Sequence, residues 1–166
     1  MTGNYEAWSK DKKYGLRIPS EVLQKMLSFC QKAGNMETGG ILVGYYNRHH
    51  DCAIITDCSN PPRDSKCGEN YFYRGVHGLQ KWLIRLWHLG QQMYYLGEWH
   101  FHPFANPNPS DIDIKQLRSN AGNKSYNCPE PVIFIIGGNP NNKWLCKPLV
   151  YIRDKEAIEL FKQWEK

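Results

Sequence analysis

Residues 97–113 read GEWHFHPFANPNPSDID, and this stretch holds the most informative pattern in the chain. Side chains alternate between faces in an extended strand, so His100 and His102 project to one side while Trp99 and Phe101 project to the other. Three prolines between residues 103 and 109 then end the strand, because proline has no N–H to donate to a sheet ladder. The pattern predicts a strand with one polar face for chemistry and one apolar face for the core.

A helix is expected to begin at Ser110, because Ser-x-x-Asp is the pattern of an N-terminal capping box. Asp113 would lie on the first helical turn, where its carboxylate can reach back toward the histidine pair. Two imidazoles and one carboxylate form a three-ligand set, which leaves the fourth tetrahedral position of a zinc ion open, as in catalytic sites. Each half of the pattern is ambiguous alone, since His-x-His occurs by chance and Ser-x-x-Asp also describes an ordinary helix cap.

A second polar pattern, ETGG at residues 37–40, lies directly before an apolar run of strand character. Its paired glycines permit close approach of a backbone, so they can hold Glu37 at the edge of a site and leave room for a substrate chain. Glu98 lies on the same face of its strand as His100. Glu37 and Glu98 are therefore two rival candidates for a carboxylate that acts as a general base.

Length and charge set the broad class of the protein. A chain of 166 residues fits one domain with a single core, spanning residues 1–166, with a flexible polar lead over residues 1–13. Lys and Arg total 21 against 16 Asp and Glu, a formal net charge of +5. The charge is spread without runs of one sign, so we expect no nucleic-acid partner.

Hydropathy and cysteine usage predict where the protein works. Residues 1–20 contain no apolar stretch of the signal-peptide type, and no segment has eighteen uninterrupted apolar residues, so we expect no membrane contact. The six cysteines form no Cys-x-x-Cys pair, and several lie inside apolar runs. Free thiols and a cytoplasmic location are the expected combination.

Hydrophobic periodicity predicts an α/β protein with a mixed, curved β-sheet flanked by helices. Strands are expected over residues 14–18, 41–46, 53–57, 93–102, 132–136 and 144–152. Helices are expected over residues 20–33, 75–92 and 110–119, with a final helix that Asp154 caps and that buries Ala157, Ile158 and Phe161. Residues 60–74 and 120–130 are expected to be surface insertions.

The whole constellation resembles the JAMM/MPN metalloenzyme family in its compact bacterial JAB form. His-x-His-Pro, then six residues, then Ser-x-x-Asp, with Glu-Thr-Gly-Gly upstream, is its motif, and the likeness in element order covers nearly the whole chain. The resemblance implies the JAMM/MPN, cytidine-deaminase-like architecture. It further implies one zinc ion bound by His100, His102 and Asp113, with Glu37 as general acid/base and Ser110 as a hydrogen-bond donor to the reacting centre.

The function implied by this resemblance is zinc-dependent hydrolysis of an amide or isopeptide bond. The substrate would be a ubiquitin-like or otherwise conjugated protein, cut after its C-terminus, within a bacterial conjugation or antiphage defence operon. Zinc lowers the pKa of water to about 7, which suits a carboxylate base such as Glu37 at neutral pH. An extended substrate tail is expected to add as a strand along the sheet edge near residues 41–46. The candidate substrate contacts are Gly39, Gly40, Ile41 and Phe104.

Two alternatives use the same residues. A peptidase that trims a sulfur-carrier protein and releases an amino acid would need the same site, and only the accepted conjugate separates it from an isopeptidase. A non-catalytic MPN binding module, or a structural zinc site closed by a fourth protein ligand such as Cys128, is opposed by the presence of Glu37 and by the open three-ligand set.

Overall fold

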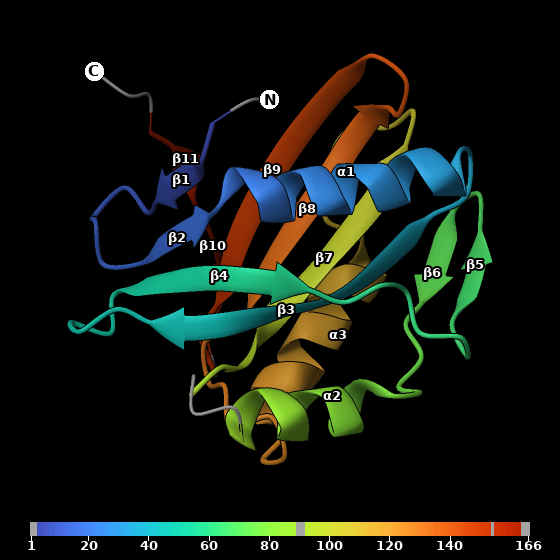
Figure 1. Cartoon of the computed structure of the whole chain (residues 1–166). Helices are drawn as coiled ribbons and strands as arrows, with labels where there is room; N and C mark the ends of the chain where they lie inside the picture. The colour runs from blue at the N-terminus through green and yellow to red at the C-terminus, as the bar shows by residue number, and fades with distance from the viewer. Residues whose placement is uncertain (1–2, 89–91, 154, 164–166) are drawn as a thin grey trace.

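The computed structural model describes residues 3–88, 92–153 and 155–163, and one large β-sheet runs through these ranges (Figure 1). Within them, nine strands join in the order β10-β9-β8-β7-β3-β4-β2-β1-β11. Two neighbouring pairs, β2 with β4 and β7 with β8, are parallel, and the other pairs are antiparallel. The mixed sheet of an α/β protein is therefore confirmed. The strands of this sheet are β1 (Tyr5–Trp8), β2 (Gly15–Ile18), β3 (Thr38–Tyr46), β4 (Cys52–Cys58), β7 (Tyr94–Pro103), β8 (Val132–Asn139), β9 (Lys143–Tyr151), β10 (Ala157–Glu159) and β11 (Phe161–Lys162).

Helices cover both faces of the sheet, as predicted. Helix α1 (Ser20–Ala33) crosses one face, and α3 (Asp111–Gly122) lies behind the other in Figure 1. Helix α2 (Leu79–Leu86) lies at the lower edge in this view and packs on the same side as α3, against Ile41 and Val43 of β3. The predicted bounds of α1 are confirmed, and Gly34 ends it with φ 65°. Helix α3 continues to Gly122, a little beyond the predicted end at residue 119. None of the helices in the described ranges has the length and apolar character needed to cross a bilayer.

The core follows the alternation of β7. Trp99 and Phe101 face α1 and are almost completely buried with its apolar stripe, so the predicted apolar face of this strand is confirmed. On the opposite face, Leu117 and Ala121 of α3 pack against Ile133 of β8. Strand β8 is buried along residues 132–136, which agrees with the prediction of a strand covered on both faces.

Both ends of the chain differ from the predictions. The flexible lead expected over residues 1–13 is wrong, because β1 lies within it and pairs with both β2 and β11. The final helix is also wrong, because β10 pairs with β9 and β11 pairs with β1; the Asp154 cap falls outside the described residues. Segments this short have no decisive period of their own, and their partners along the sheet edges determine their conformation.

The first insertion is more ordered than predicted, and the helix after it is shorter. Residues 60–74 contain the hairpin of β5 (Lys66–Gly68) and β6 (Tyr71–Tyr73), a small sheet separate from the large one (Figure 1). The backbone N–H groups of Val76 and His77 donate to the Asp64 carboxylate, at 3.0 Å each. These bonds tie the segment before Gly78 to the insertion, so α2 begins only at Leu79.

Gly97 lies where the pairing of β7 with β3 shifts register, with Leu42 opposite Gly97 and Val43 opposite Tyr95. Its φ is 151°, and a Cβ here would collide with the Val132 carbonyl oxygen. We expect Gly97→Ala to lower the free energy of unfolding by about 3 kcal/mol, measured by denaturant titration. Gly122→Ala is the control, because that glycine ends α3 and has open space around its Cβ position. Equal stability of the two variants would contradict this account.

Candidate metal centre

Strand β7 presents His100 and His102 on one face near its C-terminal end, between β3 and β8. Both histidines are buried, with 7% and 8% of their surface exposed. Their common direction and the opposite direction of Trp99 and Phe101 confirm the predicted alternation.

The start of α3 directs Asp113 toward the histidines. Ser110 and Asp113 form a capping box, in which the Asp113 N–H donates to Ser110 Oγ while Asp113 Oδ2 accepts from the Ser110 N–H at 2.7 Å. The Ser110 hydroxyl donates to the same Oδ2 at 2.8 Å. In this position Asp113 Oδ1 lies 2.5 Å from His100 Nδ1, and Asp113 Oδ2 lies 3.4 Å from His102 Nε2. Capping and contact with the histidines are therefore compatible.

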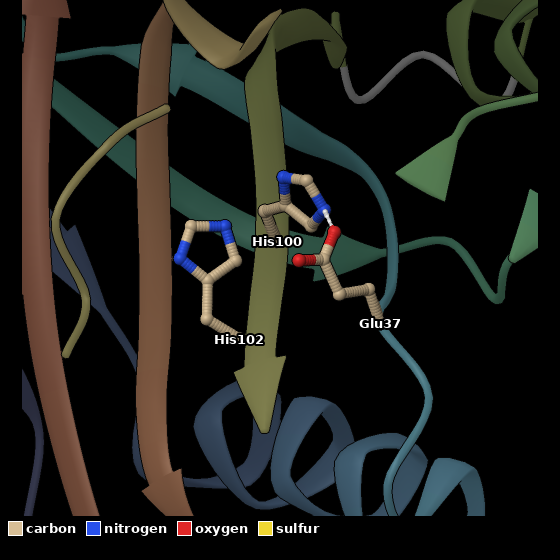
Figure 2. A group of neighbouring side chains, drawn as sticks. All are labelled: Glu37, His100 and His102. Atoms are coloured by element: carbon tan, nitrogen blue, oxygen red, sulfur yellow. Dashed lines mark ion pairs between the residues drawn. The ribbon is translucent and has the colours of Figure 1, made fainter. Parts of the chain in front are cut away.

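Glu37 reaches the histidines because β3 pairs with β7. Thr38, the first residue of β3, lies opposite Phe101, and Gly39 lies opposite His100. The Glu37 N–H also donates to the Gly68 carbonyl at 2.8 Å, which joins this residue to the β5–β6 hairpin. Figure 2 shows the Glu37 carboxylate directed at His100, with Oε2 3.3 Å from Nε2.

The ligand atoms of Glu37, His100 and His102 all lie within 4.8 Å of one another. Asp113 contacts both histidines but falls outside this tight group. Within the described residues, His100 Nε2 is buried without a hydrogen-bond partner of good geometry. An orphaned imidazole nitrogen beside a second imidazole and a carboxylate is a donor set that fits a divalent metal such as zinc.

The electrostatics of the group also fit a cation. Burial lowers the pKa of His100, but the adjacent Asp113 and Glu37 outweigh burial and raise this pKa to about 9. Burial opposes ionisation of Asp113, yet hydrogen bonds from both histidines hold its pKa well below its usual range. The two carboxylates therefore favour a positive charge at His100, and a bound metal ion would supply positive charge at the same place.

Known proteins resemble this chain in sequence and in fold. Residues 19–147, most of the chain, match the family of prokaryotic homologs of the JAB domain. This chain belongs to the prokaryotic JAB-domain family. A solved structure, the protein DSY2949 from Desulfitobacterium hafniense, superposes with a TM-score of 0.61 and 18% identity over 86% of each chain, and so has a similar fold.

Several curated proteins are similar to this JAB-family chain. It is 42% identical to a protein named CD-NTase/cGAS isopeptidase from Enterobacter hormaechei subsp. hoffmannii, over 89% of this chain and 81% of that protein. A protein of the same name from Escherichia coli (strain TW11681) is 33% identical, over 80% and 81%. A probable metalloprotease, y4qB, from Sinorhizobium fredii is 29% identical, over 77% and 78%. The chain is therefore a hydrolase of the protease class, and its relatives together with the Glu37 group indicate a bound metal ion.

Glu98, the rival candidate for the base, is engaged elsewhere in this JAB domain. Its carboxylate accepts hydrogen bonds from Arg74 Nε at 2.9 Å and from Asn120 Nδ2 at 2.6 Å. Neither partner was singled out from the sequence, because no motif or spacing marks them. Cys128, the fourth ligand that a closed zinc site would need, packs in the apolar cluster of Leu79 and Met93, and Tyr46 Oη lies 3.8 Å from its sulfur.

The candidate substrate contacts on β3, namely Gly39, Gly40 and Ile41, are buried in the structure. Strand addition near residues 41–46 is wrong, because β3 lies inside the sheet and pairs with both β7 and β4. A Cβ at Gly39 would collide with the Phe72 ring, and one at Gly40 would collide with Ser59. The chain's own packing therefore requires these glycines, and Ile41 beside them is completely buried.

A cleft opens over the group of Glu37, His100 and His102. It is bounded by the β5–β6 hairpin, by the loop after β7 and by the start of α3, and its walls include Glu37, Tyr71, His100, Asn108, Ser110 and Ile112. Tyr71 and Ile112 are exposed there. Phe104 lies in the same loop, directly after Pro103, and is 62% exposed at φ 57°. Its backbone N–H donates to the Gly138 carbonyl at 2.8 Å, which anchors the loop to β8.

Proposed function

We propose that this JAB-family protein is a zinc-dependent isopeptidase that removes a ubiquitin-like protein conjugated to a CD-NTase, within an antiphage conjugation system. The observation that carries the proposal is the group of half-buried Glu37 with buried His100 and His102, which contacts Asp113 and opens to a cleft. The relatives named CD-NTase/cGAS isopeptidase support the choice of target. A cytoplasmic location is part of the proposal, and it is supported by six cysteines that are all free thiols.

The resemblance assigns the metal to His100, His102 and Asp113, and the tight group adds Glu37 as a further possible donor. Bound zinc supplies a Lewis-acid charge that activates water and polarises the substrate carbonyl. Glu37 then has two tasks: its carboxylate takes the proton of the attacking water and later delivers it to the departing amine. We assign the Ser110 hydroxyl, at the positive N-terminal end of α3, as the donor to the carbonyl oxygen as charge develops there; for this it turns away from Asp113 Oδ2, which keeps the bond from the Ser110 N–H.

The cleft supports an extended peptide as the substrate. Exposed Tyr71 and Ile112 offer apolar contacts on two walls, and Asn108 adds an amide for hydrogen bonding. We propose that the C-terminal tail of the conjugated protein lies here, with Phe104 at the loop as a substrate contact. The tail thus occupies the cleft and does not extend the large sheet at β3.

Mass spectrometry of defined conjugates tests the proposed function. The purified protein is mixed with a CD-NTase conjugate and, in parallel, with a sulfur-carrier protein carrying an extra C-terminal residue. We expect cleavage of the first at the amide bond after the C-terminus of the conjugated protein, and no release of an amino acid from the second. The opposite selectivity would favour the sulfur-carrier peptidase, and no cleavage of either would favour a non-catalytic binding module.

Metal removal is expected to stop hydrolysis. Treatment with 1,10-phenanthroline should lower the cleavage rate by at least about 100-fold, because the Lewis-acid contribution amounts to several kcal/mol. One equivalent of zinc should restore the rate, and metal analysis should find one ion per chain. Circular dichroism of the chelated protein serves as the folding control. Full activity in the metal-free sample would contradict the proposed chemistry.

A further inference from the structure

We propose that Arg74, Glu98 and Asn120 are positioning residues, whose buried hydrogen-bond network holds the walls of the metal centre in place. The inference rests on the proposed function, since it concerns the alignment of the same site. It differs from the family's motif, because none of the three residues belongs to the His-x-His or Ser-x-x-Asp pattern.

The network converges on one oxygen atom. Glu98 Oε1 accepts from Arg74 Nε at 2.9 Å, lies 2.8 Å from Arg74 Nη2, and accepts from Asn120 Nδ2 at 2.6 Å. The side chains of the ion pair are only 6% and 11% exposed. Two tyrosines extend the network, because Arg74 Nη2 donates to Tyr126 Oη at 3.1 Å and Asn120 Nδ2 donates to Tyr95 Oη at 3.0 Å.

Two members lie at short, fixed spacings from candidate metal ligands. Glu98 precedes His100 by two residues on β7, so the two side chains share one face of the strand. Asn120 follows Asp113 by seven residues on α3, which is about two helical turns, so these side chains share one face of the helix. The bond from Asn120 to Glu98 therefore fixes the face of α3 that carries Asp113 against the face of β7 that carries His100.

The third member anchors the hairpin. Arg74 follows β6, two residues after Phe72, whose ring lies 5.3 Å from the His100 ring between centroids. The hairpin does not pair with the large sheet, yet the Gly68 carbonyl at its other strand accepts from the Glu37 N–H. Arg74 and Gly68 thus connect the hairpin to β7 and to Glu37 respectively. A shift of the hairpin would displace both Phe72 and Glu37.

Stability alone is a poor reason for this arrangement. A buried ion pair loses so much hydration that replacing both partners with apolar residues is often neutral or stabilising. Arginine instead supplies a fixed geometry, because its planar guanidinium group sets the directions of its hydrogen bonds. The network therefore has its main effect on the alignment of three separate elements around the metal site.

The experiment is the apolar double variant Arg74→Met/Glu98→Leu, compared with wild type and with Arg17→Met/Glu6→Leu. The control removes the exposed pair between β1 and β2, which lie at the other end of the sheet order. We expect the test variant to keep its melting temperature within a few degrees. Its zinc affinity, from chelator competition, should fall about tenfold, and its kcat should fall about tenfold with a smaller change in KM. The Co²⁺ absorption spectrum should change in the test variant only.

A folded double variant with wild-type zinc affinity and an unchanged Co²⁺ spectrum overturns the inference. If the double variant does not fold, Arg74→Lys tests the inference instead, because it keeps the buried positive charge and removes the planar guanidinium group. We expect its zinc affinity to fall about threefold, and wild-type affinity in this variant overturns the inference as well. The metal measurements need no substrate, so they test the network even if the proposed isopeptidase activity fails.

Discussion

Glu37→Gln is expected to lower the rate of conjugate hydrolysis by about 10²–10⁴-fold while the metal and the fold are retained. The amide has the size of the carboxylate but cannot take up a proton from water. The backbone of residue 37 keeps its bond to the Gly68 carbonyl, so the hairpin should stay in place. The carboxylate lies 3.3 Å from His100, close enough to serve the metal site.

Cleavage kinetics, metal analysis and thermal unfolding on the same preparations check this result. Glu21→Gln, at an exposed position in the first turn of α1, is the matched control and should behave as wild type. Retained hydrolysis in Glu37→Gln would transfer the role of base to Glu98, although the ion pair of Glu98 with Arg74 opposes that role. Loss of the metal in Glu37→Gln would identify Glu37 as a ligand.

His102→Ala and Asp113→Asn are each expected to weaken zinc binding by at least about 100-fold, and to abolish hydrolysis as a consequence. His102→Ala removes one imidazole from a group whose ligand atoms lie within 4.8 Å. Asp113→Asn removes the charge that lies 2.5 Å from His100 Nδ1. Chelator competition measures the affinities, and cleavage of the conjugate measures the activity.

The His102→Ala and Asp113→Asn variants should differ in their free energy of unfolding. Asp113 also completes the capping box with Ser110, so Asp113→Asn should cost about 1 kcal/mol in unfolding free energy even without metal. His102→Ala lies outside the cap and should leave α3 intact. Ser110→Ala is the control for the cap, since it shares the stability loss and should keep most of the zinc affinity. If Asp113→Asn binds zinc normally while Glu37→Gln does not, the ligands are Glu37, His100 and His102.

Local sequence patterns predicted the elements that carry their own signal. The stripe of α1, the alternation along β7 and the capping box at Ser110 follow from the preferences of a few neighbouring residues, and the structure agrees with each. The errors occur where conformation depends on a distant partner. The strands β1, β10 and β11 are short segments held by pairing along the sheet edges, and periodicity could not distinguish them from a loose lead or a helix.

The sequence by itself determined the family resemblance, the side of β7 on which the histidines lie and the cap that directs Asp113 inward. Only the tertiary structure decided that β3 lies inside the sheet, that Glu37 reaches His100, and that Arg74 and Asn120 converge on Glu98. The physical reason is the range of the interactions. A strand face or a helix cap depends on residues a few positions apart, whereas the approach of Glu37 and Arg74 requires strand pairing and hairpin docking between remote segments.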